Sequence, residues 1–192
     1  MEKLNGVGFR PWIGERYGRQ SRFGVRVLVL GESHYDWLKR NCPENKVTIE
    51  VVEYHTQCFP KEDRRLPFFT KIANVLRGER GWIDDSDIAS LFQEIAFYNF
   101  VQTFVGDAPR GNPTFRQWVE AQAPFRTVLD ALQLDAVLVL GFRLRDHILE
   151  WPADIEHAVI GHPASSHLRY DEAFPEFQGL VERAKSRVGR VS

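Results

Sequence analysis

Short, continuously apolar runs that end in glycine are the feature that most constrains the fold of this chain. Three of them stand far apart in the sequence: residues 25–30 before Gly31, residues 136–140 before Gly141, and residues 158–160 before Gly161. A strand that is buried on both faces has such a run of Val, Ile and Leu, whereas a half-exposed strand alternates apolar and polar residues. The runs therefore predict a parallel sheet that is covered on both sides.

Helical periodicity fills most of the intervals between the expected strands. Strands are expected at residues 25–30, 96–101, 136–140 and 157–160, and helices at residues 68–76, 85–95, 115–123, 125–132, 142–149 and 175–188. Strands that alternate with helices in this way predict the α/β class, with helices on both faces of the sheet. The segment before the first strand is rich in glycine and aromatic residues, and we expect an ordered arm without regular structure there.

Length and composition exclude several classes of protein. A chain of 192 residues favours one domain, with the arm at residues 1–24 and a core at residues 25–188. A net charge of −1 argues against a protein that coats nucleic acid, and no apolar run is long enough to span a membrane. The first residues lack the apolar stretch of a signal peptide, so we expect a cytoplasmic protein. Cys42 and Cys58 lack the spacing of a zinc or iron–sulfur site, and no cofactor is expected.

Two of the strand-ending turns carry side chains suited to chemistry. The first is Gly31-Glu-Ser-His-Tyr35, and the second is Gly161-His-Pro-Ala-Ser-Ser-His167. In an open α/β sheet the ligand lies beyond the carboxyl ends of the strands, where both turns are expected. Asn99 lies near the end of another expected strand. These positions predict one polar pocket built from distant parts of the chain.

The order of these motifs resembles the uracil-DNA glycosylase superfamily. The resemblance covers most of residues 25–167 and is carried by Gly31-Glu-Ser-His-Tyr35, Phe97-Tyr-Asn99, Val137-Leu-Val-Leu-Gly141 and His162-Pro-Ala-Ser165. It implies a three-layer αβα domain with a short, mostly parallel four-stranded sheet. It also implies a DNA-repair glycosylase that hydrolyses the N-glycosidic bond of uracil, or a related altered base, flipped out of DNA.

The resemblance implies a role for each residue of the base pocket. Asn99 would hydrogen-bond the uracil edge, because a carboxamide offers one donor and one acceptor group. His162 would stabilise the negative charge that develops on the leaving base. Tyr35 would exclude the methyl group of thymine, and Phe59 would stack on the base.

The segment after the His-Pro motif corresponds to a loop that enters the DNA minor groove in the superfamily. Ser165 and Ser166 would contact DNA there, Leu168 would be the wedge, and Arg169 would bind phosphate. An ordinary approach to the last helix explains the same residues equally well. The expected partner is DNA that contains uracil or another altered base, with no membrane and no obligate protein partner.

The first turn departs from the superfamily at the catalytic carboxylate. Ser33 stands where the best-known members have a water-directing Asp, and His34 replaces the usual Pro. Glu32 is the neighbouring carboxylate, as in some other branches of the superfamily. The candidate catalytic residues are therefore Glu32, Ser33 and His162.

Two other functions remain open on this sequence. The substitution at Ser33 also suits a catalytically inactive module that binds a nucleobase or DNA. The Gly-Glu-Ser-His turn also resembles that of erythromycin-esterase-like proteins, which suits a small-molecule or metal-dependent hydrolase. Its ligands or acid–base groups would be Glu32, His34, His162 and His167.

Three tryptophans lie in or beside the expected helices, namely Trp82, Trp118 and Trp151. We expect them to pack in the core rather than to stack on bases.

Overall fold

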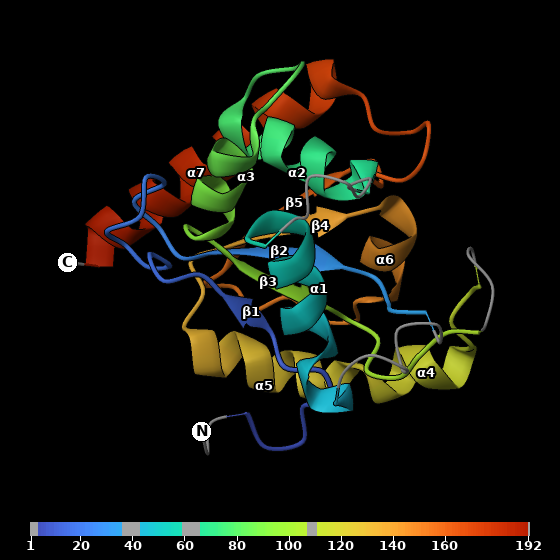
Figure 1. The fold of residues 1–192 in the computed structure, drawn as a ribbon. Helices are drawn as coiled ribbons and strands as arrows, with labels where there is room; N and C mark the ends of the chain where they lie inside the picture. Colours follow the sequence, from blue (N-terminus) through green and yellow to red (C-terminus); the bar gives the residue numbers. More distant parts are fainter. Residues whose placement is uncertain (1–3, 36–42, 59–65, 107–110, 192) are drawn as a thin grey trace.

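The computed structural model describes residues 4–35, 43–58, 66–106 and 111–191, which form a sheet between two sets of helices (Figure 1). Its five strands lie in the order β1-β3-β2-β4-β5. They are β1 (Trp12–Ile13), β2 (Val27–Gly31), β3 (Ala96–Asn99), β4 (Ala136–Leu140) and β5 (Glu156–Ile160). Strands β2 to β5 are parallel to one another, and β1 is antiparallel to β3. The α/β class predicted from the sequence is confirmed.

The expectation of a four-stranded sheet is wrong, because β1 adds an antiparallel strand at one edge. Trp12 pairs with Phe97, and Ile13 pairs with Ala96. The Trp12 indole N–H also donates a hydrogen bond to the Phe92 carbonyl at 3.1 Å. A two-residue strand is too short to produce a period, and contacts with distant residues stabilise it. Part of the segment expected to be an irregular arm therefore completes a mixed sheet.

Six helices lie near their expected positions, one of them with a long extension, whereas the short 3-10 helix η3 (Glu44–Lys46) and helix α1 (Val47–Thr56) lie in a segment for which the sequence predicted no helix. The six are α2 (Pro67–Arg77), α3 (Asp85–Phe92), α4 (Phe115–Glu120), α5 (Gln122–Leu132), α6 (Phe142–His147) and α7 (Tyr170–Val191). Asp84 caps α3 by accepting a hydrogen bond from the Asp87 N–H at 2.7 Å. Helix α7 begins at Tyr170, before the Pro175 at which the sequence predicted its start.

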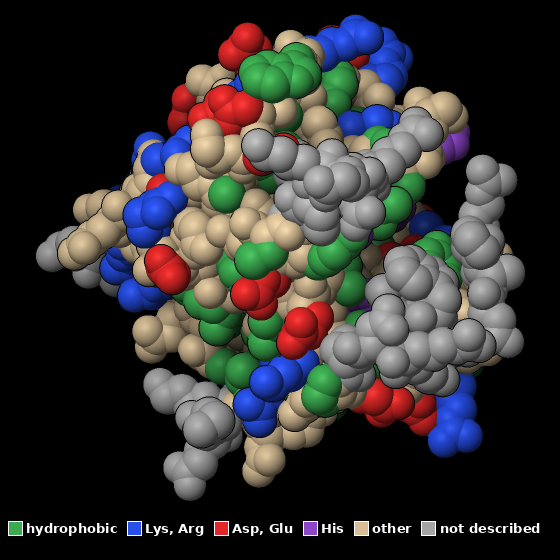
Figure 2. All heavy atoms as spheres, in the orientation of Figure 1, with side chains coloured by type: hydrophobic (Ala, Val, Ile, Leu, Met, Phe, Trp, Pro, Cys, Tyr) green, Lys and Arg blue, Asp and Glu red, His purple; other side chains and the backbone are tan. Residues whose placement is uncertain are grey.

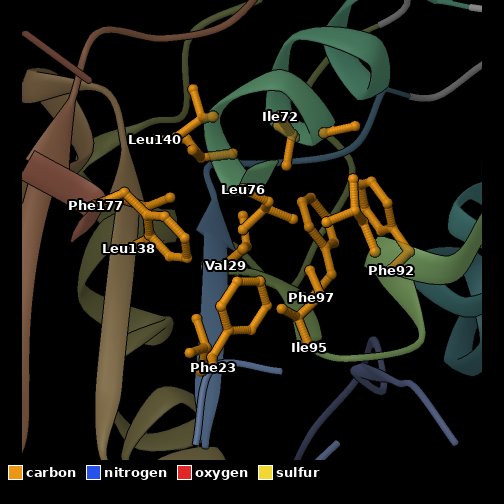
Figure 3. Close-up of a cluster of buried hydrophobic side chains, with 14 of the residues drawn as sticks. Phe23, Val29, Ile72, Leu76, Phe92, Ile95, Phe97, Leu138, Leu140 and Phe177 are labelled. Atoms are coloured by element: carbon orange, nitrogen blue, oxygen red, sulfur yellow. The ribbon is translucent and has the colours of Figure 1, made fainter. Parts of the chain in front are cut away.

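Apolar side chains cover both faces of the sheet in two clusters. On one face the strands pack against α2, α3 and α7, and on the other face against α4, α5 and α6. Figure 3 shows the first cluster, which includes Val29, Leu138, Leu140, Ile72, Leu76 and Phe177. Neighbouring strand residues alternate between the clusters: Val29 and Leu138 face the first, and Leu30 and Val139 the second. Burial on both faces explains the continuous apolar runs.

The surface carries both signs of charge. On the face seen in Figure 2, Lys and Arg side chains are interspersed with Asp and Glu, in keeping with the net charge of −1. Within the described ranges, no helix has both the length and the apolar character needed to cross a bilayer.

Candidate functional site

Four polar side chains follow or end the parallel strands at their common carboxyl edge. Asn99 ends β3 and is in register with Gly31, after which Glu32 follows β2. Arg143 lies in α6, directly beyond β4, and His162 follows β5. Together with Phe68 these four residues form what we call the carboxyl-edge site. Parallel strands bring their ends to one edge, and this topology gathers residues from distant parts of the sequence.

Glu32 is held by an arginine through both carboxylate oxygens. Arg143 Nε donates to Glu32 Oε2 at 2.8 Å, and Nη2 donates to Oε1 at 2.5 Å. The remaining guanidinium nitrogen of Arg143 donates to the Asn112 side-chain oxygen. Such a two-pronged pair fixes orientation as well as charge, so Glu32 has a defined place at the end of β2.

His162 is half-buried and neutral at physiological pH. Burial lowers the pKa of its imidazole; the nearby Glu32 carboxylate opposes this effect, and the Arg143 and Lys71 charges add to it. The Ala164 N–H donates a hydrogen bond to Nδ1 at 3.1 Å. In the neutral ring the proton therefore resides on Nε2, which is left as a donor for a ligand.

The aromatic ring beside His162 belongs to Phe68, in the first turn of α2. Its centroid lies 5.6 Å from that of His162 and 6.3 Å from that of Phe97. Lys71, one turn further along α2, donates to the Pro163 carbonyl at 2.8 Å. This contact attaches α2 to the His-Pro turn and keeps the ring next to the imidazole.

Asn99 is pressed against the strand beside it. A Cβ atom at Gly31 would lie only 2.1 Å from Asn99 Oδ1, so any other residue at position 31 would displace the Asn99 side chain. The Asn99 carbonyl accepts a hydrogen bond from the Gln102 side chain at 2.7 Å, and Gln102 accepts one from the Phe9 N–H at 2.8 Å. Asn99 is 6% exposed, and no hydrogen bond to its carboxamide is found within the described part of the chain. It is thus a fixed amide that retains its hydrogen-bonding groups for a ligand.

The other residues of the first turn differ in how deeply they are buried. Ser33 and Tyr35 are half-buried after Glu32, and Phe59 lies outside the described residues. His34 is 4% exposed, and its Nε2 is 2.8 Å from Thr48 Oγ1. Burial lowers the pKa of His34 to about 3. This histidine is therefore part of the packing beneath the site.

The side chains that the alternative of a metal-dependent hydrolase would need form no metal site within the described residues. Across residues 4–35, 43–58, 66–106 and 111–191, no group of three or more His, Cys, Asp or Glu residues is arranged to hold a metal ion. His34 points to Thr48, and Glu32 is paired with Arg143.

The segment after the His-Pro motif has mainly local contacts. Ser165 Oγ donates to the His162 carbonyl at 2.8 Å and accepts from the His167 N–H at 3.1 Å, so it stabilises the turn. Leu168 is half-buried against the first apolar cluster. Arg169 pairs with Asp171 at 3.0 Å and with Glu172 at 3.2 Å. Ser166 is exposed.

The prediction for the tryptophans is wrong at one position. Trp118 is buried and Trp151 is half-buried against the second cluster, but Trp82 is 84% exposed. Trp82 follows α2 in a loop that places its side chain in solvent.

Sequence reasoning missed Arg143, Phe68 and Lys71. A signal was available for Arg143, because Gly141 ends an apolar run as Gly31 and Gly161 do. The first polar residue that follows Gly141 could therefore also have been predicted as a site residue. Phe68 fitted the apolar face of a helix, and nothing in its spacing separates a core ring from a site ring.

The carboxyl-edge site offers a fixed amide, a neutral imidazole with a free Nε2–H, an aromatic ring and a carboxylate–arginine pair. These groups suit a planar, polar ligand with hydrogen-bonding edges and a developing negative charge. The two cavities of about 350 and 670 Å³ at α5 and at α7 lie elsewhere and contain none of these residues. No family model and no curated protein matches this chain.

Proposed function

We propose that this protein belongs to the uracil-DNA glycosylase superfamily. It would hydrolyse the N-glycosidic bond that joins uracil, or a related altered base, to DNA. The observation that carries the proposal is that Phe68 lies beside His162 at the carboxyl edge of the sheet at which Asn99 ends β3, with Phe97 of β3 next to the Phe68 ring. The motif order of the sequence points to the same chemistry.

The base would lie between the amide and the ring. The Asn99 carboxamide can accept from the N3–H of uracil and donate to O4, whereas cytosine presents the reverse pattern. Phe68 supplies an apolar face on which the base can stack. Tyr35 would exclude a methyl group at C5, as the resemblance implies. We assign to Phe68 the stacking role that the resemblance gives to Phe59, which lies outside the described residues.

Bond cleavage requires stabilisation of the departing base. When the bond between the sugar C1′ and the base N1 breaks, its electron pair stays with the base and places negative charge on O2. The neutral His162 ring can donate its Nε2–H to that oxygen. A water oxygen then bonds to C1′, and one of the water protons ends on the base N1, so the products are free base and an abasic sugar.

A second candidate function follows from the state of Glu32. Both of its oxygens accept from Arg143, so the carboxylate is not free to direct a water molecule or to face a sugar cation. This arrangement favours a module that binds a flipped base without hydrolysing it.

One experiment separates these functions. Release of free base is measured from single- and double-stranded oligonucleotides that contain uracil, with binding to a non-hydrolysable deoxyuridine analogue measured in parallel. His162→Ala should lower the release rate about 100- to 1,000-fold, as loss of an oxyanion donor does, while analogue binding persists. His167→Ala, at an exposed position in the same segment, is the control and should leave release unchanged.

The possible outcomes are distinct. Binding without release by the wild-type protein supports the module. Absence of both binding and release, or equal release by wild type and His162→Ala, contradicts the proposal.

A further inference from the structure

Arg143 is more accessible than the carboxylate that it holds. The Arg143 side chain is 49% exposed, whereas that of Glu32 is 11% exposed. All three guanidinium nitrogens have partners, two contacts on Glu32 and one on Asn112. The ion pair thus lies beyond the end of β2, and Arg143 is on its solvent-exposed side.

The pairing decides what Glu32 can do. A carboxylate and a guanidinium in contact have no net charge, so together they exert little field on a positively charged sugar nearby. Glu32 can act on such a sugar only after Arg143 leaves it. Separating the pair leaves both charges without a partner, so it requires a new anion for Arg143 and a positively charged group near Glu32.

A nucleic acid strand supplies such an anion. A flipped nucleotide carries a phosphodiester on each side of its sugar, and the guanidinium fork matches phosphate oxygens as well as it matches a carboxylate. A base that lies against Asn99 and Phe68 brings its sugar, and with it these phosphates, to the same edge of the sheet. The half-exposed Arg143 is the cation of the carboxyl-edge site that faces solvent there.

We infer that Arg143 is a phosphate-binding positioning residue that exchanges Glu32 for a phosphodiester of the bound strand. The charge of Glu32 can act on the sugar only when the strand is bound and its phosphate holds Arg143. A nucleobase or nucleoside without phosphates leaves Arg143 paired with Glu32. This inference rests on the proposed function in that it takes the ligand to be a DNA strand.

Binding of a single-stranded oligonucleotide with the non-hydrolysable deoxyuridine analogue tests the phosphate contact. Arg143→Gln should weaken binding about tenfold and reduce the slope of log affinity against log salt by ~0.7, the value for one phosphate on a single strand. Arg143→Lys keeps a point charge and should retain most of the slope. Arg145→Gln is the matched control, because Arg145 lies on the same helix, forms its ion pair with the exposed Asp146 and lies over the Phe142 ring at 5.4 Å.

The exchange itself is tested by a double-mutant cycle with Glu32→Gln. If Glu32 and the phosphate compete for Arg143, Glu32→Gln tightens binding several-fold in the wild-type background and much less in the Arg143→Gln background. Simple repulsion between Glu32 and phosphate gives the opposite order, because an unpaired carboxylate repels more strongly. Equal or greater tightening without Arg143, or an unchanged salt slope in Arg143→Gln, would overturn the inference.

The outcomes also separate this inference from the proposed function. Coupled changes in binding without any release of base would support the exchange and contradict hydrolysis. Release of base by a protein whose Arg143→Gln variant binds as wild type does would support hydrolysis and contradict the exchange.

Discussion

His34 shows how strongly the environment of a single side chain can differ from that of its neighbours. It lies two residues after Glu32, yet it is buried against Thr48, with the ring of Phe9 at its edge and a centroid distance of 5.5 Å. Burial lowers the pKa of His34 to about 3. In the pH range in which the histidine becomes protonated in the unfolded chain, it therefore stays neutral in the folded protein.

This difference makes stability depend on pH. Below the unfolded pKa of about 6.5, His34 binds a proton in the unfolded state but not in the folded state. The free energy of unfolding therefore has its full value above that pH and decreases as the pH falls towards 3. Between pH 7 and 4.5 the wild-type protein should lose on the order of 2 kcal/mol more unfolding free energy than His34→Gln. Urea unfolding at several pH values measures this, with exposed His167→Gln as control. Parallel curves for wild type and His34→Gln would contradict the prediction.

Residues at the ends of strands could be placed from the sequence, but partners across the site could not. Glu32, Asn99 and His162 end or directly follow apolar runs, and parallel topology fixes where such ends meet. Arg143 meets Glu32 from 111 positions away, through a contact that depends on side-chain geometry. Phe68 has the spacing of any core residue. The sequence could have placed Arg143 at this edge, but its contact with Glu32 and the place of Phe68 beside His162 come from packing that no local pattern encodes.

Among the elements, the segment that follows β1 is held by one buried carboxylate. Glu94 precedes β3 and accepts hydrogen bonds from Arg16 Nε at 2.6 Å and from the Arg22 N–H at 2.9 Å. Burial raises the pKa of Glu94, but these hydrogen bonds and charges outweigh it, and the net pKa lies below its usual value. Glu94 therefore holds residues 16–22 against the turn that leads into β3.

Glu94→Gln should lower the free energy of unfolding by about 1–3 kcal/mol at pH 7, because an arginine loses its charged partner and a buried acceptor is replaced by a donor. A carboxyl with a lowered pKa contributes stability above its unfolded pKa, so the difference from wild type should shrink as the pH falls below ~4. Glu120→Gln breaks an exposed pair with Arg116 and should change stability by less than about 0.5 kcal/mol. Equal effects of the two substitutions would refute the role assigned to Glu94.

Most element types followed from periodicity because both faces of the sheet are covered, which makes the strands continuously apolar and most helices one-sided; helix α1 (Val47–Thr56) was not predicted. The edge strand β1 escaped prediction for a physical reason. Its two residues are held by the partner strand and by the Trp12 indole, and neither contact leaves a repeat in the sequence.

At the scale of the whole molecule, the sheet joins two apolar clusters into one structure. Leu180 in α7 belongs to the first cluster, and Leu129 in α5 belongs to the second. Both lie against the same strands, so loss of packing on one face should weaken the other as well. We expect the two layers to unfold together.

Leu180→Ala and Leu129→Ala should each cost about 2–5 kcal/mol of unfolding free energy, with a single urea transition in both variants. If the two layers unfold together, far-UV circular dichroism and tryptophan fluorescence should give the same midpoint. Fluorescence is sensitive to both clusters, because Trp12 lies in the first and Trp118 in the second. Exposed Leu149→Ala is the control and should change stability by less than about 0.5 kcal/mol. Separate midpoints for the two signals in Leu129→Ala would mean that the layers are independent.

The short strand β1 also has a consequence for the behaviour of the protein in concentrated solution. Without it, the outer side of β3 would present unpaired N–H and carbonyl groups in a flat, apolar strand, which is a template for pairing with another molecule. Trp12 and Ile13 occupy that margin at Phe97 and Ala96. These two residues therefore cover part of the edge of β3 that would otherwise be open to pairing with another molecule.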